Sequence, residues 1–123
     1  MGCIAFSPLA QGMLSEKYIN KIPKISRANE DTSLSPKLLT DRYKKKIINL
    51  KEIANKRNQT VSQMALSWVL RHKEVTSALI GARTLKQLDE CLDSLNNLNF
   101  TKKELKSILL FSCHKQSTLK SFL

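Results

Sequence analysis

The sequence predicts an α/β fold in which two parallel strands belong to a larger sheet or barrel and most of the other residues are helical. Two short apolar runs, residues 2–7 and 75–80, have the length of strands. The long stretch between them carries helical patterns, and such a crossover joins parallel strands rather than a hairpin. Two strands alone leave unpaired edges and little core, so the chain resembles part of a bigger fold.

The first apolar run is typical of a buried strand, and Pro8 ends it. Residues 19–36 are polar and aperiodic and contain two prolines. They are predicted to form a long loop, and loops of that length in compact domains are usually functional or disordered.

Two helices are expected next. Ser35 and Pro36 suit the N-cap and first position of a helix over residues 37–56. A capping box at Thr60–Gln63 begins the second helix, which is expected to end near His72. Their expected inner faces are Leu39, Tyr43, Ile47, Leu50 and Ala54, then Val61, Met64, Ala65, Trp68 and Val69.

The second apolar run is halted by Gly81, which permits a tight bend and a close backbone approach. A capping box at Thr84–Gln87 then starts a helix, and a third box at Thr101–Glu104 starts the last one. We expect one domain over residues 1–111 and an irregular tail over 112–123. The helix after Thr84 carries leucines on one side, at Leu85, Leu88, Leu92 and Leu95.

The composition suits one cytoplasmic domain of 123 residues, with 41% hydrophobic and 25% charged residues. No stretch approaches the roughly 20 apolar residues that cross a bilayer, and the apolar start lacks the basic region of a signal peptide. We therefore expect no membrane contact. Three cysteines at wide, irregular spacing suit reduced thiols rather than a disulfide framework or a metal site.

A net charge of +11 raises the alternative of a nucleic-acid-binding protein. The lysines are scattered, however, with neighbours only at Lys44–Lys46 and Lys102–Lys103, and no aromatic residues lie between them. Charge without a motif says little about partners, so we expect no nucleic acid. A basic surface also suits a phosphorylated ligand.

The turn after the second strand is the clearest candidate binding site. Backbone N–H groups and the positive end of a helix dipole point into a turn that leads from Gly81 to Thr84. Arg83 adds a planar, permanently charged group suited to a phosphate. The alternative is an ordinary strand-to-helix connection with a surface arginine, since many helix N-termini bind nothing.

This turn and two further segments resemble segments of the aldo-keto reductase family in order and spacing, over residues 2 to about 110. The long loop looks closest to those of potassium-channel β-subunits and bacterial L-glyceraldehyde 3-phosphate reductases. The loop after the family's seventh strand is resembled by Phe6–Gly12 with Lys17–Tyr18 and Ser26–Arg27. The helix that follows is resembled by Thr60–Leu70. The eighth strand and its helix are resembled by Leu79–Arg83 with Gln87–Leu88 and Glu90.

The resemblance implies the C-terminal fragment of a (β/α)8 TIM barrel, namely its last two strands with their helices, helix-rich as an isolated chain. It also implies an oxidoreductase that uses NADP(H) to reduce small aldehydes and ketones. The residues implied to line the pyrophosphate and nicotinamide side are Ser7, Pro8, Leu9, Ala10 and Gln11.

The remaining cofactor contacts are implied in the same way. Lys17 and Arg27 would pair with phosphates, and Gly81 and Arg83 would meet the adenosine 2′-phosphate. The adenosine end would contact Gln87 and Glu90. One position departs from the family, because Cys91 stands where relatives carry an asparagine that hydrogen-bonds the adenine, and a thiol is a weak donor and acceptor.

The resemblance also implies that the reacting residues are not in this chain. The family uses a tyrosine as general acid with a lysine, an aspartate and a histidine, and all four lie upstream of the matched segments. Tyr18 and Tyr43 fall in the loop and on a helix stripe, so neither is that tyrosine. We expect a carbonyl substrate only when the N-terminal barrel half is supplied; the alternative is a non-catalytic remnant or interaction module from a split or truncated gene.

Overall fold

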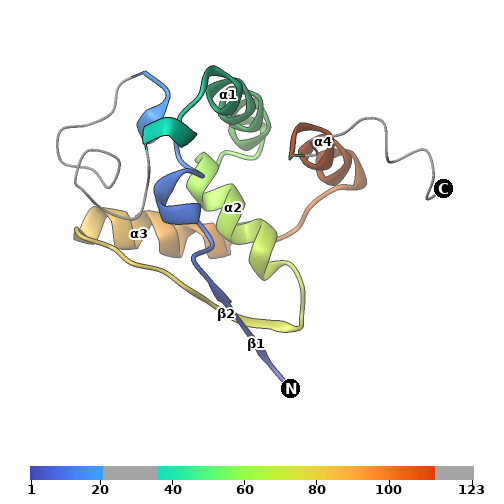
Figure 1. Cartoon of the computed structure of the whole chain (residues 1–123). Helices are drawn as coiled ribbons and strands as arrows, with labels where there is room; N and C mark the ends of the chain where they lie inside the picture. The colour runs from blue at the N-terminus through green and yellow to red at the C-terminus, as the bar shows by residue number, and fades with distance from the viewer. Residues whose placement is uncertain (21–35, 113–123) are drawn as a thin grey trace.

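The computed structural model describes residues 1–20 and 36–112, and within them two parallel strands pair directly (Figure 1). Strand β1 comprises Cys3–Phe6 and strand β2 comprises Val75–Leu79, with Phe6 opposite Leu79. The predicted parallel pair with a helical crossover is confirmed. The helices are α1 (Asp41–Lys56) and α2 (Val61–Leu70) between the strands, and α3 (Leu85–Asp93) and α4 (Lys102–Ser112) after them.

The two-stranded sheet is covered on one face only. Helix α2 packs against β2 (Figure 1), and the paired Ala5 and Ala78 are half-buried. The alternate residues Ile4, Phe6 and Leu79 belong to the other face, where Phe6 is 82% and Leu79 is 56% exposed. The expectation of a buried first strand is wrong for the described chain, because a parallel strand is buried only where layers cover both faces of its sheet.

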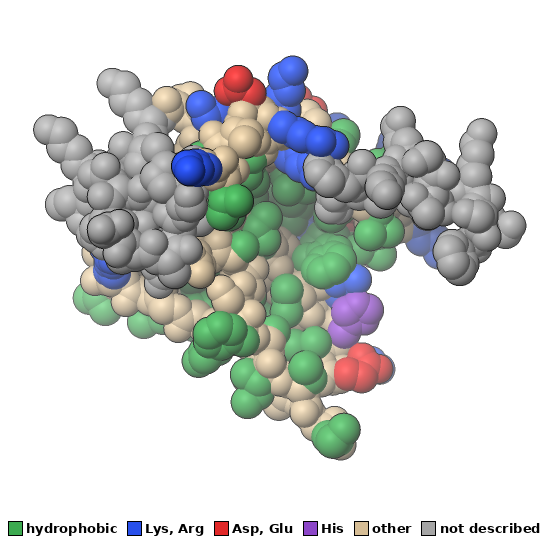
Figure 2. All heavy atoms as spheres, viewed as in Figure 1, with side chains coloured by type: hydrophobic (Ala, Val, Ile, Leu, Met, Phe, Trp, Pro, Cys, Tyr) green, Lys and Arg blue, Asp and Glu red, His purple; other side chains and the backbone are tan. Residues whose placement is uncertain are grey.

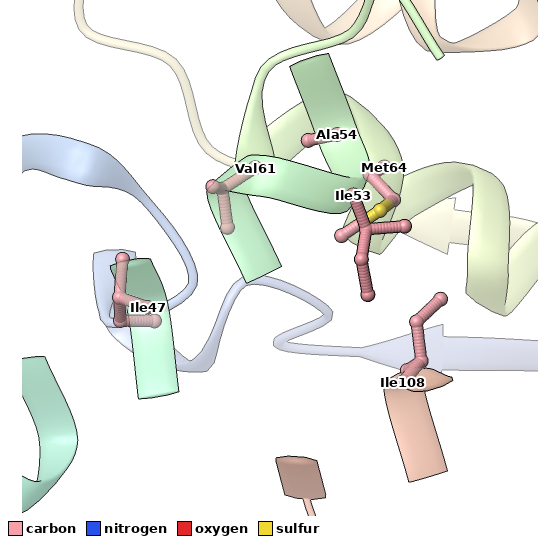
Figure 3. Close-up of a cluster of buried hydrophobic side chains, with 6 residues drawn as sticks. All are labelled: Ile47, Ile53, Ala54, Val61, Met64 and Ile108. Atoms are coloured by element: carbon pink, nitrogen blue, oxygen red, sulfur yellow. The ribbon is translucent and has the colours of Figure 1, made fainter. Parts of the chain in front are cut away.

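The hydrophobic core lies between helices α1, α2 and α4 rather than on the open face of the sheet (Figure 3). A second, smaller cluster surrounds the buried Tyr18 and includes Met13, Leu39 and Tyr43. The predicted apolar stripe is confirmed, because each of its residues, including Leu39 just before α1, belongs to one of these clusters or packs against it. The main core residues are Ile47, Ile53, Ala54, Val61, Met64 and Ile108.

The inner face of α2 differs in part from the predicted one. Val61 and Met64 are buried as expected, and Leu66 and Ser67 are buried as well. Helix α2 contacts α1, α3 and β2, so it is enclosed on more than a single stripe. The expected residues that are only partly buried are Ala65, Trp68 and Val69.

Helix α1 begins later than predicted. Residues Pro36–Leu38 form a separate 3-10 turn, and α1 starts at Asp41 with Thr40 as its N-cap. The Thr40 Oγ1 accepts a hydrogen bond from the Tyr43 backbone N–H at 3.2 Å. A threonine side chain that satisfies a first-turn amide defines a helix start, and the helix is therefore capped by Thr40 rather than by the predicted Ser35.

The three predicted capping boxes are present, one of them in altered form. Those at Thr60–Gln63 and Thr101–Glu104 have both reciprocal hydrogen bonds. In the third, Gln87 Oε1 accepts from the backbone N–H of Arg83 rather than from that of Thr84, at 2.8 Å. The side chain of Gln87 therefore ties the residue before the cap to α3.

Two predictions fall largely outside the described residues. Most of the predicted loop lies outside the described residues, and so does the predicted tail except for Ser112, which ends α4. Among the described helices, none is long and apolar enough to cross a membrane.

Candidate functional site

A cavity of about 530 Å³ opens beyond the carboxyl ends of the two strands. Its walls come from three parts of the chain, namely the loop after β1, the N-terminus of α2, and the segment from the end of β2 into α3. A volume of this size is in the usual range for small-molecule sites. The described chain therefore brings together segments that are about 70 residues apart in the sequence.

Every described residue of the predicted cofactor set lines this cavity, with one exception. Ala10 belongs to the same loop but is exposed and does not line the cavity. Arg27 lies outside the described residues. The predicted residues in the cavity wall are Ser7, Pro8, Leu9, Gln11, Lys17, Gly81, Arg83, Gln87 and Glu90.

The loop after β1 has an unusual backbone. Ser7, Ala10 and Gln11 have positive φ angles of 53°, 46° and 59°, and Gly12 has a φ of 90°. Side chains disfavour this conformation, which persists only where surrounding contacts hold it and is frequent at binding sites. Gly12 was not among the predicted site residues, although its glycine suits this backbone.

The neighbouring helices anchor this loop. Tyr43 on α1 donates a hydrogen bond through its hydroxyl to the Met13 carbonyl oxygen at 2.7 Å, and Ser62 on α2 donates to the Leu14 carbonyl at 3.2 Å. Burial, together with the nearby Tyr18, raises the pKa of Tyr43 to about 12. The phenol therefore keeps its proton at neutral pH and remains a donor to the loop.

The turn after β2 is built differently from the prediction. Gly81 has no positive φ, and the chain bends at Arg83 and Thr84 instead. Thr84 makes the turn by capping α3, and its Oγ1 accepts from the Gln87 backbone N–H at 3.2 Å. The bend thus depends on the cap rather than on the glycine, and it places Arg83 in the cavity wall immediately before α3.

Among the residues that the structure describes, two cations and two carboxylates line the cavity. Lys17 lies in the loop after β1, and Arg83 lies in the turn before α3. Glu16 forms an ion pair with Lys51 of α1, with 2.7 Å between Oε2 and Nζ. That pairing offsets the charge of one carboxylate and leaves the cavity wall favourable to an anion near its cationic residues.

The second carboxylate, Glu90, is held by the N-cap of α2. Its Oε1 accepts a hydrogen bond from Thr60 Oγ1 at 2.8 Å. Sequence reasoning identified Thr60 only as a cap, because a contact across 30 positions gives no local signal. Cys91 lies beside this pair in the wall, where burial raises the pKa of its thiol and the charge of Glu90 raises it further.

The cavity wall contains groups for binding but no tyrosine. Neither Tyr18 nor Tyr43 lines it. In the described part of the chain, no group of three or more histidine, cysteine or acidic side chains is arranged to hold a metal ion. The arrangement suits the binding of an anionic organic ligand.

Comparison with known proteins identifies the family of the chain. The model of the Aldo/keto reductase family matches residues 1–109. Over 112 residues, the chain is 49% identical to the L-glyceraldehyde 3-phosphate reductase of Escherichia coli K12 and 47% identical to that of Escherichia coli O157:H7. Each comparison covers 88% of this chain and 32% of the relative, so the chain spans about a third of the relatives' length. The predicted family resemblance is confirmed.

Proposed function

The chain belongs to the aldo/keto reductase family of oxidoreductases, and on this premise we propose that it forms the NADP(H)-binding C-terminal part of a (β/α)8 barrel that reduces small aldehydes and ketones. The observation that carries the proposal is the shared cavity. Residues of the loop after β1 and of the turn before α3, far apart in the sequence, line one space. The relatives are L-glyceraldehyde 3-phosphate reductases, so glyceraldehyde 3-phosphate is the first substrate to test.

The chemistry of the wall suits a phosphorylated dinucleotide. Lys17 and Arg83 supply positive charge, and the N-terminus of α3 adds the positive end of a helix dipole. Arg83 presents a planar group that can bind two phosphate oxygens at once, which favours its assignment to the 2′-phosphate of NADP(H). Glu90, oriented by Thr60, offers a carboxylate to hydroxyl or amino groups at the adenosine end.

The loop after β1 is assigned to the other end of the cofactor. Hydrogen bonds from Tyr43 and Ser62 hold the end of this loop at the Met13 and Leu14 carbonyls. Ser7, Pro8 and Gln11 of the same loop lie in the cavity wall. A preformed loop of this kind lowers the entropy that is lost on binding. When bound, NADPH supplies the hydride, and the residues of this chain hold and orient it, while the groups that protonate the carbonyl belong to the N-terminal part of the family's fold.

Replacing Arg83 with alanine tests the phosphate assignment. We expect NADPH to bind about 10- to 100-fold more weakly, because a charge-assisted hydrogen bond contributes about 1.5–3 kcal/mol. NADH binding should change little, so the preference for NADPH should disappear. Titration of the full-length chain with each nucleotide, followed by calorimetry, measures both effects.

Lys86→Ala is the matched control, since Lys86 is an exposed cation of α3 outside the cavity wall. It should leave both affinities unchanged. An equal loss of NADPH affinity in both variants would assign the effect to overall charge and contradict the site.

The second candidate is a non-catalytic remnant or an interaction module. It is favoured by the open face of the sheet, where Phe6 and Leu79 are exposed as they are on a surface that contacts another protein. Under this alternative the family resemblance records ancestry, and neither NADPH nor NADH binds to the chain. The same titration therefore separates the two candidates.

A further inference from the structure

The Thr60 hydroxyl makes two hydrogen bonds at once, and they serve different parts of the molecule. Its oxygen accepts from the Gln63 backbone N–H at 3.2 Å, which caps α2. Its proton is donated to Glu90 Oε1 at 2.8 Å. A threonine hydroxyl has a single proton to donate, so this donor is used entirely for the Glu90 carboxylate.

The Thr60–Glu90 hydrogen bond joins two helices inside the cavity wall. Thr60 precedes α2 and Glu90 belongs to α3, 30 positions later in the sequence, and the two helices contact each other. Both side chains line the cavity, and both residues are half-buried. A hydrogen bond to an ionised carboxylate is stronger than one between neutral groups, so it favours one orientation of the Glu90 side chain.

A carboxylate in this wall needs a partner on the ligand. The chain carries a net charge of +11, and Lys and Arg side chains gather over α1 at the top of the view in Figure 2. Like charges repel, so Glu90 opposes an anionic ligand unless it also accepts hydrogen bonds from that ligand. An ionised carboxylate offers about four acceptor positions, and the Thr60 bond uses one of them. The others suit hydroxyl or amino groups.

We propose that Thr60 is a positioning residue, which holds Glu90 in the orientation that accepts hydrogen bonds from the adenosine end of the cofactor. The proposal rests on the NADP(H)-binding function proposed above. The alternative is that Thr60 only caps α2 and that its contact with Glu90 has no effect on binding. The two differ in whether loss of the hydroxyl acts on affinity through Glu90.

A double-mutant cycle on the full chain separates them. Thr60→Val keeps the shape of the side chain but removes the hydroxyl, and Glu90→Ala removes the carboxylate. Each should weaken the binding of NADPH, and of adenosine 2′,5′-bisphosphate as a probe of the adenosine end, by about 2- to 10-fold. In the Glu90→Ala background, Thr60→Val should cause no further loss, because residues that act as a unit are not additive. Additive losses, or tighter binding by Glu90→Ala, would overturn the proposal.

Two further variants of Thr60 separate the donor from the cap. Thr60→Ser keeps both hydrogen bonds and should bind like the wild type. Thr60→Gly loses the donor but largely keeps the helix start, because glycine is tolerated as an N-cap. It should lose as much affinity as Thr60→Val does, whereas a residue that only caps the helix would give little loss.

Thr101→Val is the matched control. Thr101 caps α4 in the same way, since its Oγ1 accepts from the Glu104 backbone N–H at 3.2 Å and donates to Glu104 Oε2 at 3.0 Å. Thr101 does not line the cavity. The variant should leave both affinities unchanged, and a loss equal to that of Thr60→Val would contradict a specific role for Thr60.

The thiol of Cys91 reports on Glu90 without any cofactor. Burial raises the pKa of this thiol, and the charge of Glu90 raises it further. In a chain whose other two cysteines are replaced by serine, iodoacetamide should alkylate Cys91 several times faster in Glu90→Ala and in Thr60→Val than in the wild type, because the thiolate is the reactive form. The double variant should react no faster than Glu90→Ala.

The alkylation rates and the titrations fail separately. An unchanged rate in Thr60→Val or in Glu90→Ala overturns the proposal, whether or not the chain binds NADPH. Rates as expected in a chain that binds neither nucleotide would reject the cofactor assignment and retain Thr60 as the residue that positions Glu90.

Discussion

Cys91 shows how one residue sets the chemistry of the cavity wall. Its thiol is half-buried beside Glu90, and burial and the neighbouring charge both raise its pKa. The thiol therefore stays neutral at physiological pH, where it is a weak hydrogen-bond donor and a weak acceptor. The family resemblance places an asparagine here, whose amide is both a good donor and a good acceptor.

Cys91→Asn should accordingly tighten NADPH binding. One added hydrogen bond contributes about 0.5–1.5 kcal/mol, which corresponds to an approximately 2- to 10-fold lower Kd. Calorimetric titration measures the change, and Cys91→Ala serves as the control because it removes the thiol and adds no polar group. Affinity that rises equally in both variants, or in neither, would contradict an adenine contact at this position.

Arg57 is the residue that joins the end of α1 to the start of α4. The side chain is buried, and its guanidinium lies 3.7 Å from the centre of the Phe100 ring. Nothing local in the sequence distinguishes it from the lysines around it, since most of its partners lie 40 or more positions away. Its hydrogen-bond acceptors are Gln59 Oε1, the carbonyl oxygens of Asn97 and Asn99, and Glu104 Oε2.

At the scale of elements, Glu104 belongs both to the capping box of α4 and to the Arg57 ion pair. Its burial alone would raise the carboxyl pKa. The hydrogen bonds from Thr101 and the charge and hydrogen bond of Arg57 outweigh that effect and hold the pKa below its ordinary value of 4.5. The folded state therefore releases this proton more readily than the unfolded state, and the pair stabilises the fold above the unfolded pKa.

We expect this stabilisation to disappear as the pH falls from about 5 through the folded pKa of Glu104. Glu104→Gln should lower the free energy of unfolding at pH 7 by about 1 kcal/mol. Between pH 7 and pH 4, the free energy of unfolding should fall less in this variant than in the wild type. Urea unfolding at the two pH values measures both. Glu52→Gln, at an exposed position of α1, is the control; equal losses in the two variants would contradict a specific role for the Arg57 pair.

The elements themselves were largely predictable, and the reason is local. Threonine caps and apolar periodicity specify α2, α3 and α4 from a few neighbouring residues. The start of α1 was missed because Ser35–Pro36 and Thr40 both suit a helix start, and the second one is used. The bend at Arg83 was assigned to Gly81 for a similar reason, since a glycine permits a turn but does not require one.

At the scale of the whole molecule, burial was the least predictable property. The apolar strands indicated a buried sheet, yet in the described chain the core lies among the helices and one sheet face is open. Sequence patterns report which side chains favour burial, while the layer that buries them belongs to tertiary structure. Most residues of the cavity wall, in contrast, were predictable, because the family resemblance assigned them position by position. Thr60 was missed because it contacts Glu90 across 30 positions, and Gly12 was missed because it contributes through its backbone conformation.

The same open architecture predicts that the chain alone does not reduce aldehydes. The cavity holds groups for binding, and no tyrosine lines it, so a carbonyl oxygen near the cofactor has no phenolic general acid. Loss of a general acid alone slows a reaction by about 100- to 10,000-fold. With glyceraldehyde 3-phosphate or methylglyoxal, we therefore expect NADPH oxidation, followed by the absorbance of the cofactor, to match that of buffer. The L-glyceraldehyde 3-phosphate reductase of Escherichia coli K12 serves as the positive control with the first substrate. The contrary result is steady NADPH oxidation that rises in proportion to the concentration of this chain and is lost in Arg83→Ala. It would show that residues of this chain complete the reaction, which contradicts the proposed division between binding and catalysis.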